Sequence, residues 1–224
     1  MSGVGTAAGM HEELGQVAAD LEVAPASQVM GWAVQRFGAG LVVASSFQDC
    51  VLIDLATAVD PGVEVVFLDT GAHFAETLAY VEVVQQRYHL NLVVLHPTAG
   101  ADEWPCGSAR CCELRKVAPL VAHLAGRKAW ATGLRRADSP LRADAPAVSW
   151  DQGRGVVKLN PLAAWTDAGM AAYVSDHELP VHPLSNSGYA SIGCAPTTTP
   201  VAEGADPRSG RWAGSAKTEC GLHL

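Results

Sequence analysis

The chain has 224 residues, a formal net charge of −8 and a mean hydropathy of +0.13. Hydrophobic residues make up 49% and charged residues 17%, which excludes a disordered chain and fits one α/β domain with small appendages. The acidic balance argues against general binding of nucleic acid or of an anionic membrane.

Residues 1–37 predict one or two amphipathic helices, with Ser27 as the N-cap of the second and Gly38 as its stop. The start of the chain lacks the basic segment followed by an apolar segment that is typical of a secretory signal. No apolar run approaches the roughly 20 residues of a membrane span. We therefore expect a cytoplasmic protein that begins with a helical segment over residues 1–38.

Strands and helices alternate over the next hundred residues. Short apolar runs predict buried strands at 41–44, 63–68, 92–95 and 128–132, and helices are predicted at 49–58, 74–88 and 111–124. This alternation predicts an α/β fold, in which a mostly parallel sheet carries helices on both faces.

The character of the sequence changes after Gly133, where glycine, proline and tryptophan become frequent. Only residues 166–176 predict a further helix, and residues 180–224 are expected to be loop and tail that lie over the domain. We expect a main domain over 39–205 and a mobile C-terminal tail over 206–224.

Two loops follow predicted strands at the edge where open α/β sheets bind ligands. Ser45 and Ser46 stand between a strand and a helix, where free N–H groups and the helix dipole favour a phosphate. A plain strand–turn–helix connection explains them equally well. Asp69 follows the next strand and is either an acceptor for ribose hydroxyls or a cap of its own turn.

Basic residues are concentrated in one part of this acidic chain. Eight of the 15 lysines and arginines lie between Arg110 and Arg142, with only two acidic residues in that window. Arg208 and Arg211 stand three apart, and the arginine fork suits phosphate or sulfate. The pattern favours a small anionic ligand over its alternative, a solvated helix face with solvated loops.

Six cysteines stand at positions 50, 106, 111, 112, 194 and 220, without the spacing of a disulfide framework. Cys111 and Cys112 are adjacent, so they are poorly placed to pair with each other, and with Cys194 they make three soft ligands for zinc or an iron–sulfur cluster. Lys116, one turn later, would offset the negative charge of such a site. The alternative is a pair of buried, inert cysteines.

Cys220 lies in the terminal sequence Lys217-Thr-Glu-Cys-Gly-Leu-His223. Lys217 and His223 favour the nucleophilic thiolate, whereas Glu219 opposes it, so we expect further activation from groups that the tail meets on docking. The alternative is an incidental surface cysteine.

Taken together, these stretches resemble the assimilatory adenylyl-sulfate (APS) reductases, which are relatives of the PAPS reductases. The resemblance runs from about Leu41 to His223. It rests on the segments VASS, VVFLDTG, HFAET, CCELRKVAPL, WATGLRR, KLNPLAAWT, SIGCAP, RSGRWAG and KTECGLH.

The resemblance implies an adenine nucleotide α-hydrolase-like fold and the thioredoxin-dependent reduction of adenylyl sulfate to sulfite and AMP. Cys220 is the implied nucleophile, which passes through an S-sulfonate. Ser45, Ser46, Leu68 and Gly133 are the implied nucleotide pocket, and Lys116, Arg142, Arg208 and Arg211 the implied phosphosulfate site. The alternatives are a PAPS reductase, which the retained cysteine pair disfavours, and a cluster-deficient, non-catalytic nucleotide-binding relative.

The chain departs from the family at the metal site. The cluster-bearing branch holds a [4Fe–4S] cluster with four cysteines, of which Cys111, Cys112 and Cys194 are present and the fourth is Thr197. Either Cys106 or an outside molecule supplies the fourth ligand, or the cluster binds weakly, or it is absent. We favour weak binding or absence, because Cys106 belongs to the Cys111 side and its loop would have to fold back. Cys50 is interpreted as a buried helix residue without a redox role.

Overall fold

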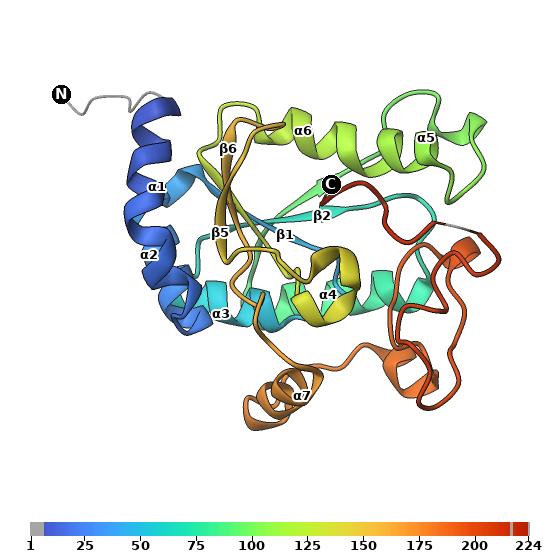
Figure 1. Cartoon of the computed structure of the whole chain (residues 1–224). Coiled ribbons are helices and arrows are strands. Elements are labelled where there is room, and N and C mark those ends of the chain that lie inside the picture. Colours follow the sequence, from blue (N-terminus) through green and yellow to red (C-terminus); the bar gives the residue numbers. More distant parts are fainter. Residues whose placement is uncertain (1–6, 216, 224) are drawn as a thin grey trace.

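The computed structural model describes residues 7–215 and 217–223. Within them, one mixed sheet of six strands forms the centre of the fold (Figure 1). The strands lie in the order β3-β2-β1-β4-β6-β5. Their bounds are β1 Leu41–Ser45, β2 Glu64–Leu68, β3 Asn91–Leu95, β4 Ala129–Thr132, β5 Val148–Asp151 and β6 Val156–Leu159. Neighbouring strands are parallel except for β5, which is antiparallel to β6, so the predicted mostly parallel sheet is confirmed.

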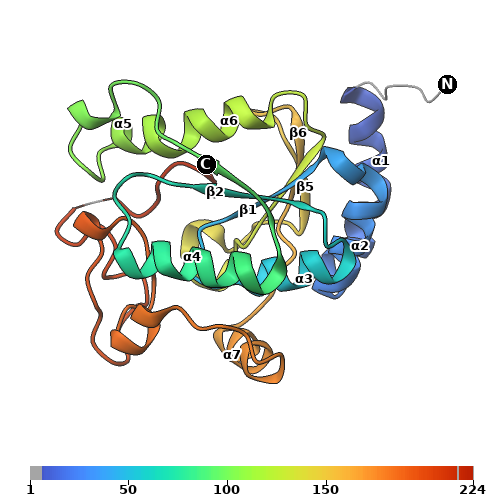
Figure 2. The same cartoon turned by 180° about the vertical axis from the view of Figure 1, so that it is seen from behind.

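Helices cover both faces of this sheet. They are α1 Ala7–Glu22, α2 Ala26–Phe37, α3 Val51–Val59, α4 Ala75–Tyr88, α5 Ala109–Cys112, α6 Ala118–Leu124 and α7 Asp167–Asp176. A π-helical turn, Glu113–Val117, joins α5 to α6, so the predicted helix over 111–124 is one interrupted helix. Figure 2 shows α5 and α6 on one side of the sheet, with α2, α3 and α4 on the other.

The strands alternate their side chains between two buried layers. Leu41 and Val43 belong to the larger core cluster, which the N-terminal helices, α3, α4 and α7 complete. Val42 and Ala44 point the opposite way, into a smaller cluster with Leu120 and other residues. Burial on both faces explains why β1 appears in the sequence as an uninterrupted apolar run.

The N-terminal helices pack into the same core as the sheet, because Leu14 and Met30 belong to the larger cluster. The α2 helix ends at Gly38, whose φ of 49° confirms the predicted stop. The predicted N-cap is wrong. The amides of Gln28 and Val29 donate to the Pro25 carbonyl, so the first turn begins before Ser27.

No strand is predicted after Gly133, but β5 and β6 lie there. These two strands form a hairpin that extends the sheet beyond β4. Each has four residues, too few for an alternating pattern to stand out. The turn between β5 and β6 is closed by the Gly155 amide, which donates to the Asp151 carbonyl at 2.8 Å.

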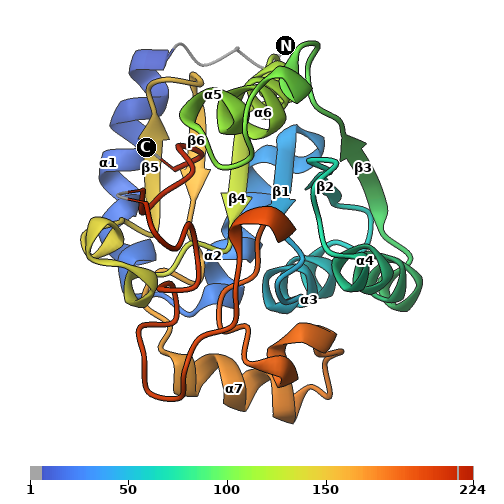
Figure 3. The same ribbon diagram turned by 90° about the vertical axis from the view of Figure 1, so that its right-hand side faces the viewer.

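Residues 180–215 and 217–223 form loops and short 3₁₀ turns that lie across the strand ends, as predicted (Figure 3). Leu222 packs against the smaller core cluster and fixes the end of the tail there. The mobility of the tail and the domain boundaries stay predictions, and residues 1–6, Ala216 and Leu224 lie outside the described residues. Among the helices described, none has the length and apolarity needed to cross a membrane.

Candidate active site

A cavity of about 660 Å³ opens at the carboxyl ends of the parallel strands. Ser45 ends β1, Leu68 ends β2 and Thr132 ends β4, and all three line the cavity. The chain runs outward from β1 to β2 and β3 and then returns to β4 on the other side, so the cavity lies where the strand order reverses. This is the place where open α/β sheets bind ligands.

Nine residues singled out from the sequence line this one cavity. They are Ser45, Ser46, Leu68, Lys116, Gly133, Arg142, Arg208, Arg211 and Cys220. Asp69 is not among the lining residues. Its Oδ1 accepts a hydrogen bond from the Gly71 amide at 2.9 Å, so Asp69 caps its own turn and the ribose interpretation is not supported.

The Ser45–Asp49 loop is shaped by a buried aromatic side chain. Phe47 has a φ of 53° and is fully buried, with its ring 5.3 Å from that of Phe67. The Phe47 amide donates to Ser45 Oγ at 3.1 Å, which closes the turn. The helix α3 begins at Val51, two residues later than predicted, because the Asp49 carboxylate caps the Val51 amide at 3.0 Å. Cys50 is buried at the start of α3, as expected.

Two of the predicted anion-binding arginines are already paired with the tail. Glu219, which is 8% exposed, accepts hydrogen bonds from Arg142 at 2.8 and 2.7 Å. It also lies 3.3 Å from Arg208 and accepts from Ser139. Burial raises the pKa of Glu219, but Arg142 outweighs that effect and the pKa lies below its usual value. The single Glu219 carboxylate therefore pairs with both arginines, and Arg142 has a second carboxylate partner in Asp138.

Arg211 and Lys116 differ from that pair, because no carboxylate among the described residues lies within 4.0 Å of either. The Arg211 guanidinium donates to Ser191 Oγ at 3.3 Å and to the Ile192 carbonyl at 3.2 Å. Its buried Nε has no partner among the described atoms. Burial and the nearby Arg208 lower the pKa of Arg211. Such a guanidinium is set to receive an anion.

Cys220 is half-buried at the wall of this cavity, within the electrostatic influence of Arg211. The two cations expected to surround it are engaged elsewhere. Lys217 Nζ donates to the Gly107 carbonyl at 2.7 Å and lies 3.0 Å from Cys112 Sγ, and the His223 ring stacks on Trp130. Arg211 is the cation that docking brings to Cys220.

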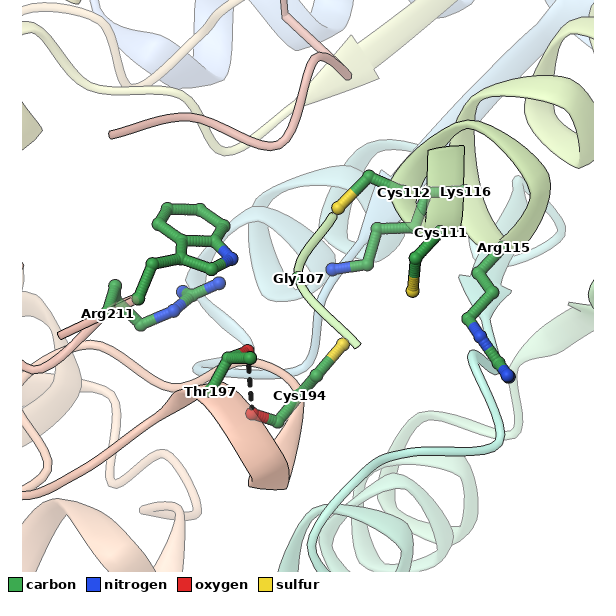
Figure 4. Close-up of a pocket in the computed structure, with 9 residues that line it drawn as sticks. Gly107, Cys111, Cys112, Arg115, Lys116, Cys194, Thr197 and Arg211 are labelled. Atoms are coloured by element: carbon green, nitrogen blue, oxygen red, sulfur yellow. Dashed lines mark hydrogen bonds between the residues drawn. The ribbon is translucent and has the colours of Figure 1, made fainter. Parts of the chain in front are cut away.

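A second, much smaller pocket contains the cysteines (Figure 4). Cys111 and Cys112 come from α5, and Cys194 comes from the loop before a 3₁₀ turn, Ala195–Thr197. The three thiols and the Lys116 amino group point toward one space in Figure 4. Lys116 and Arg211 line both this pocket and the larger cavity. These two cations therefore separate Cys111, Cys112 and Cys194 from the larger cavity.

Comparison with known proteins agrees with this geometry. Residues 40–200 match the phosphoadenosine phosphosulfate reductase domain family. The chain belongs to this family. It is 48% identical to adenosine 5'-phosphosulfate reductase of Rhodococcus opacus (strain B4), over 96% of this chain and 94% of the relative. The same name belongs to a relative from Mycolicibacterium smegmatis, which is 49% identical over 92% of each chain.

The solved structures confirm the predicted fold. Phosphoadenylyl-sulfate (PAPS) reductase from Candida auris, solved as a phosphate complex, superposes with a TM-score of 0.73 at 26% identity. The match covers 84% of this chain and 97% of that one. The predicted resemblance to the APS and PAPS reductases is thereby confirmed at the level of family.

The metal site is the point at which the sequence departs from the pattern that the resemblance implies. Among the residues described, no three His, Cys, Asp or Glu side chains are close enough to hold a single metal ion. The donor set nevertheless suits an iron–sulfur cluster, which spreads its ligands around a larger body: three thiols face one pocket beside Lys116 and Arg211. Burial raises the pKa of Cys194, but Lys116, Thr70 and Arg211 together bring it below its usual value, which favours the thiolate ligand.

Thr197 lines this pocket, and its hydroxyl already has partners. Its Oγ1 donates to the Cys194 carbonyl at 3.4 Å, the bond dashed in Figure 4. The thiol of Cys106 lies against the side chains of Cys194 and Thr197, and burial together with Cys194 and Cys111 raises its pKa to about 11. The expectation that Cys106 would remain on the Cys111 side is therefore wrong, because its loop does fold back.

Sequence reasoning missed two further features of the site. The first is the Glu219 clasp, the contact of Glu219 with Arg142 and Arg208. The second is the apolar wall of the cavity, which includes Leu52, Met170 and Val174. The contact of Glu219 with the arginines had a signal, since an acidic residue directly before Cys220 needs a cation when it is buried. The wall had none, because in the sequence its residues are ordinary apolar residues of two predicted helices.

Proposed function

We propose that this chain catalyses the thioredoxin-dependent reduction of adenylyl sulfate to sulfite and AMP in the cytoplasm, as a step of sulfate assimilation toward cysteine. The observation that carries the proposal is the position of Cys220, which shares one cavity with two cations that no carboxylate neutralises, Lys116 and Arg211. Relatives named adenosine 5'-phosphosulfate reductase, at 48% and 49% identity, support the choice of substrate.

The cavity has two chemically different ends, which match the two ends of a nucleotide sulfate. Leu52, Met170 and Val174 offer apolar surface for an adenine base. Ser45, Ser46, Leu68 and Gly133 would hold the nucleoside and its phosphate at the strand ends. This arrangement leaves the cationic end, beside Cys220, for the sulfate.

The four cations of the expected phosphosulfate site have two different roles in binding it. Arg211 and Lys116 would receive the phosphosulfate directly, because neither is neutralised in the free protein. Arg142 and Arg208 hold the tail through Glu219, so they would keep Cys220 over the substrate and contact the anion from the tail side. A preorganised cationic pocket stabilises the charge that develops in the transition state.

In the first step the Cys220 thiolate attacks the sulfur of the sulfate, and the bond from sulfur to the phosphate oxygen breaks. AMP leaves with that electron pair, and Cys220 carries an S-sulfonate. A thiolate of the dithiol protein then attacks Cys220 Sγ, and sulfite leaves with the electrons of the broken sulfur–sulfur bond. The second thiol of the donor resolves the mixed disulfide, which restores Cys220 and leaves the donor oxidised.

The cysteine pocket lies behind this site. Cys111, Cys112 and Cys194 would hold a [4Fe–4S] cluster, which when bound would supply an anionic group that orients Lys116 and Arg211 from the rear. The reacting sulfur belongs to Cys220, so the residues that bind substrate and carry out the transfer are those of the larger cavity.

Mass spectrometry of the protein mixed with adenylyl sulfate alone tests the proposal. We expect an SO3 adduct on Cys220, with release of sulfite only after a reduced dithiol protein such as thioredoxin is added. An unmodified Cys220 would contradict the mechanism. The 3′-phosphorylated nucleotide should react more slowly, and faster reaction with it would make the protein a PAPS reductase instead.

A further inference from the structure

The loop that carries Cys106 is built to lie against Thr197. The Ser108 amide donates to the Pro105 carbonyl at 3.1 Å, and Gly107 between them has a φ of 89°, the pattern of a type II turn. Cys106 therefore stands at the tip of the turn. Ser108 then caps α5 by accepting from the Cys111 amide at 3.1 Å, so the turn leads directly into the helix of the cysteine pair.

Three independent contacts hold this turn over the cysteine pocket. A Cβ atom on Gly107 would lie 2.8 Å from Thr197 Cγ2, so only glycine permits the approach. Lys217 binds the Gly107 carbonyl from the tail side at 2.7 Å. The Cys106 thiol itself interacts with the side chains of Cys194 and Thr197. Figure 4 shows Gly107 between the helix of Cys111 and the turn of Cys194.

We propose that Cys106 is the fourth ligand of the [4Fe–4S] cluster and takes the place that Thr197 leaves empty. The inference depends on the presence of the [4Fe–4S] cluster that the proposed function includes. The Cys106 thiol interacts with the side chains of Cys194 and Thr197, and both of these residues line the cysteine pocket. Ligation from a turn tip next to α5 then compensates for the threonine.

The other side chains are poor candidates for the fourth ligand. The Thr197 hydroxyl is turned to the Cys194 carbonyl, and a hydroxyl binds iron far less well than a thiolate does. Cys50 is buried elsewhere, with its thiol toward the Pro180 carbonyl. Cys220 lines the larger cavity and is the nucleophile. Cys106 is the cysteine that remains.

Iron and acid-labile sulfide, visible absorption and electron paramagnetic resonance of the full chain purified without oxygen test the proposal. We expect about four irons per chain in the unsubstituted protein. Cys106→Ala should lose at least one of them and show either a three-iron signal or no cluster. The double variant Cys106→Ala/Thr197→Cys should regain about four, which also shows that the loss does not come from misfolding.

Cys50→Ala is the matched control, because it removes a buried cysteine from outside the pocket and should keep the full iron content. Two results would overturn the inference: Cys106→Ala with unchanged iron, spectrum and reduction potential, or an unsubstituted protein without a cluster. These readouts do not involve the substrate. A failure of the reductase proposal, seen as a missing SO3 adduct on Cys220, is therefore distinguishable from a failure of this one.

Discussion

The site is made by two regions with very different architecture. Residues 41–142 supply Ser45, Lys116 and Arg142 from strand ends, a helix and the loops that follow them, so the sheet fixes their positions. Residues 180–223 supply Arg211 and Cys220 from a layer with no α-helix or β-strand over its described part. In the proposed function the sheet would supply the pocket for the nucleotide, and the loop layer would supply the nucleophile.

The two regions also differ in what holds their side chains. The first depends on burial and backbone pairing, whereas the second depends on a few specific contacts. Glu219 forms ion pairs with Arg142 and Arg208. Lys217 donates a hydrogen bond to the Gly107 carbonyl. Gly193 has no side chain, which leaves room for the Arg211 guanidinium. Single substitutions in the loop layer should therefore change activity strongly while leaving the stability of the fold nearly intact.

The largest effect should come from Cys220→Ser. A hydroxyl is not ionised at neutral pH and forms no S-sulfonate, so we expect the rate of sulfite release to fall about 10⁴-fold or more. Cys50→Ala, which removes a buried cysteine outside the cavity, should stay within a few-fold of the unsubstituted rate. Turnover in Cys220→Ser close to the original would rule out the tail as the source of the nucleophile.

The next effect concerns Arg211, the guanidinium of the loop layer that has no carboxylate partner among the described residues. Arg211→Lys keeps the charge but loses the fork and its bonds to Ser191 and Ile192, so kcat/KM should fall about 10²- to 10³-fold. Arg127→Lys is the control, since Arg127 pairs with Glu64 away from the cavity and should be neutral. Equal activity of both variants would show that Arg211 does not contact the anion.

A smaller effect is expected from Gly193→Ala. The added Cβ would lie 2.2 Å from the Arg211 guanidinium and would displace it, so kcat/KM should fall about 10-fold with little change in the melting temperature. Gly31→Ala in α2 meets nothing within 4 Å and should instead stabilise the protein by about 0.5–1 kcal/mol, without changing activity. A full-rate Gly193→Ala enzyme would mean that Arg211 tolerates displacement.

The smallest effect should come from the Glu219 clasp. The pKa of Glu219 is lowered in the folded state, so its contribution to docking is fully present above the ordinary glutamate pKa of about 4.3. The contribution is lost as the pH falls through the lower folded value. Hydrogen exchange of residues 217–223, corrected for intrinsic rates, should be constant from about pH 8 to 5 and rise a few-fold below pH 4.

Glu219→Gln supplies the control for that experiment. It should raise the exchange of the same residues a few-fold already at pH 7 and remove the additional rise at low pH, because the amide cannot ionise. If the variant and the unsubstituted protein gave identical profiles, Leu222 packing would be holding the tail instead of the ion pairs.

The sequence by itself determined the parallel sheet from β1 to β4, since short apolar runs that alternate with helices have few other arrangements. It also predicted which side chains line the cavity, because thiols, arginines and the loops at strand ends can be recognised in the sequence. It missed the β5–β6 hairpin, in which β6 pairs with β4 and β5 pairs with β6.

Only the tertiary structure decided how the loops meet. Cys106 reaches Cys194 across 88 positions, and Glu219 reaches Arg142 across 77. Neither segment has a periodic pattern that could predict such a contact. Both contacts depend on where turns, such as the one at Gly107, direct the chain once the sheet has formed. The contact between Cys106 and Cys194 and the pairing of Arg142 are therefore properties of the folded molecule, because they come from packing between segments whose sequences do not indicate each other.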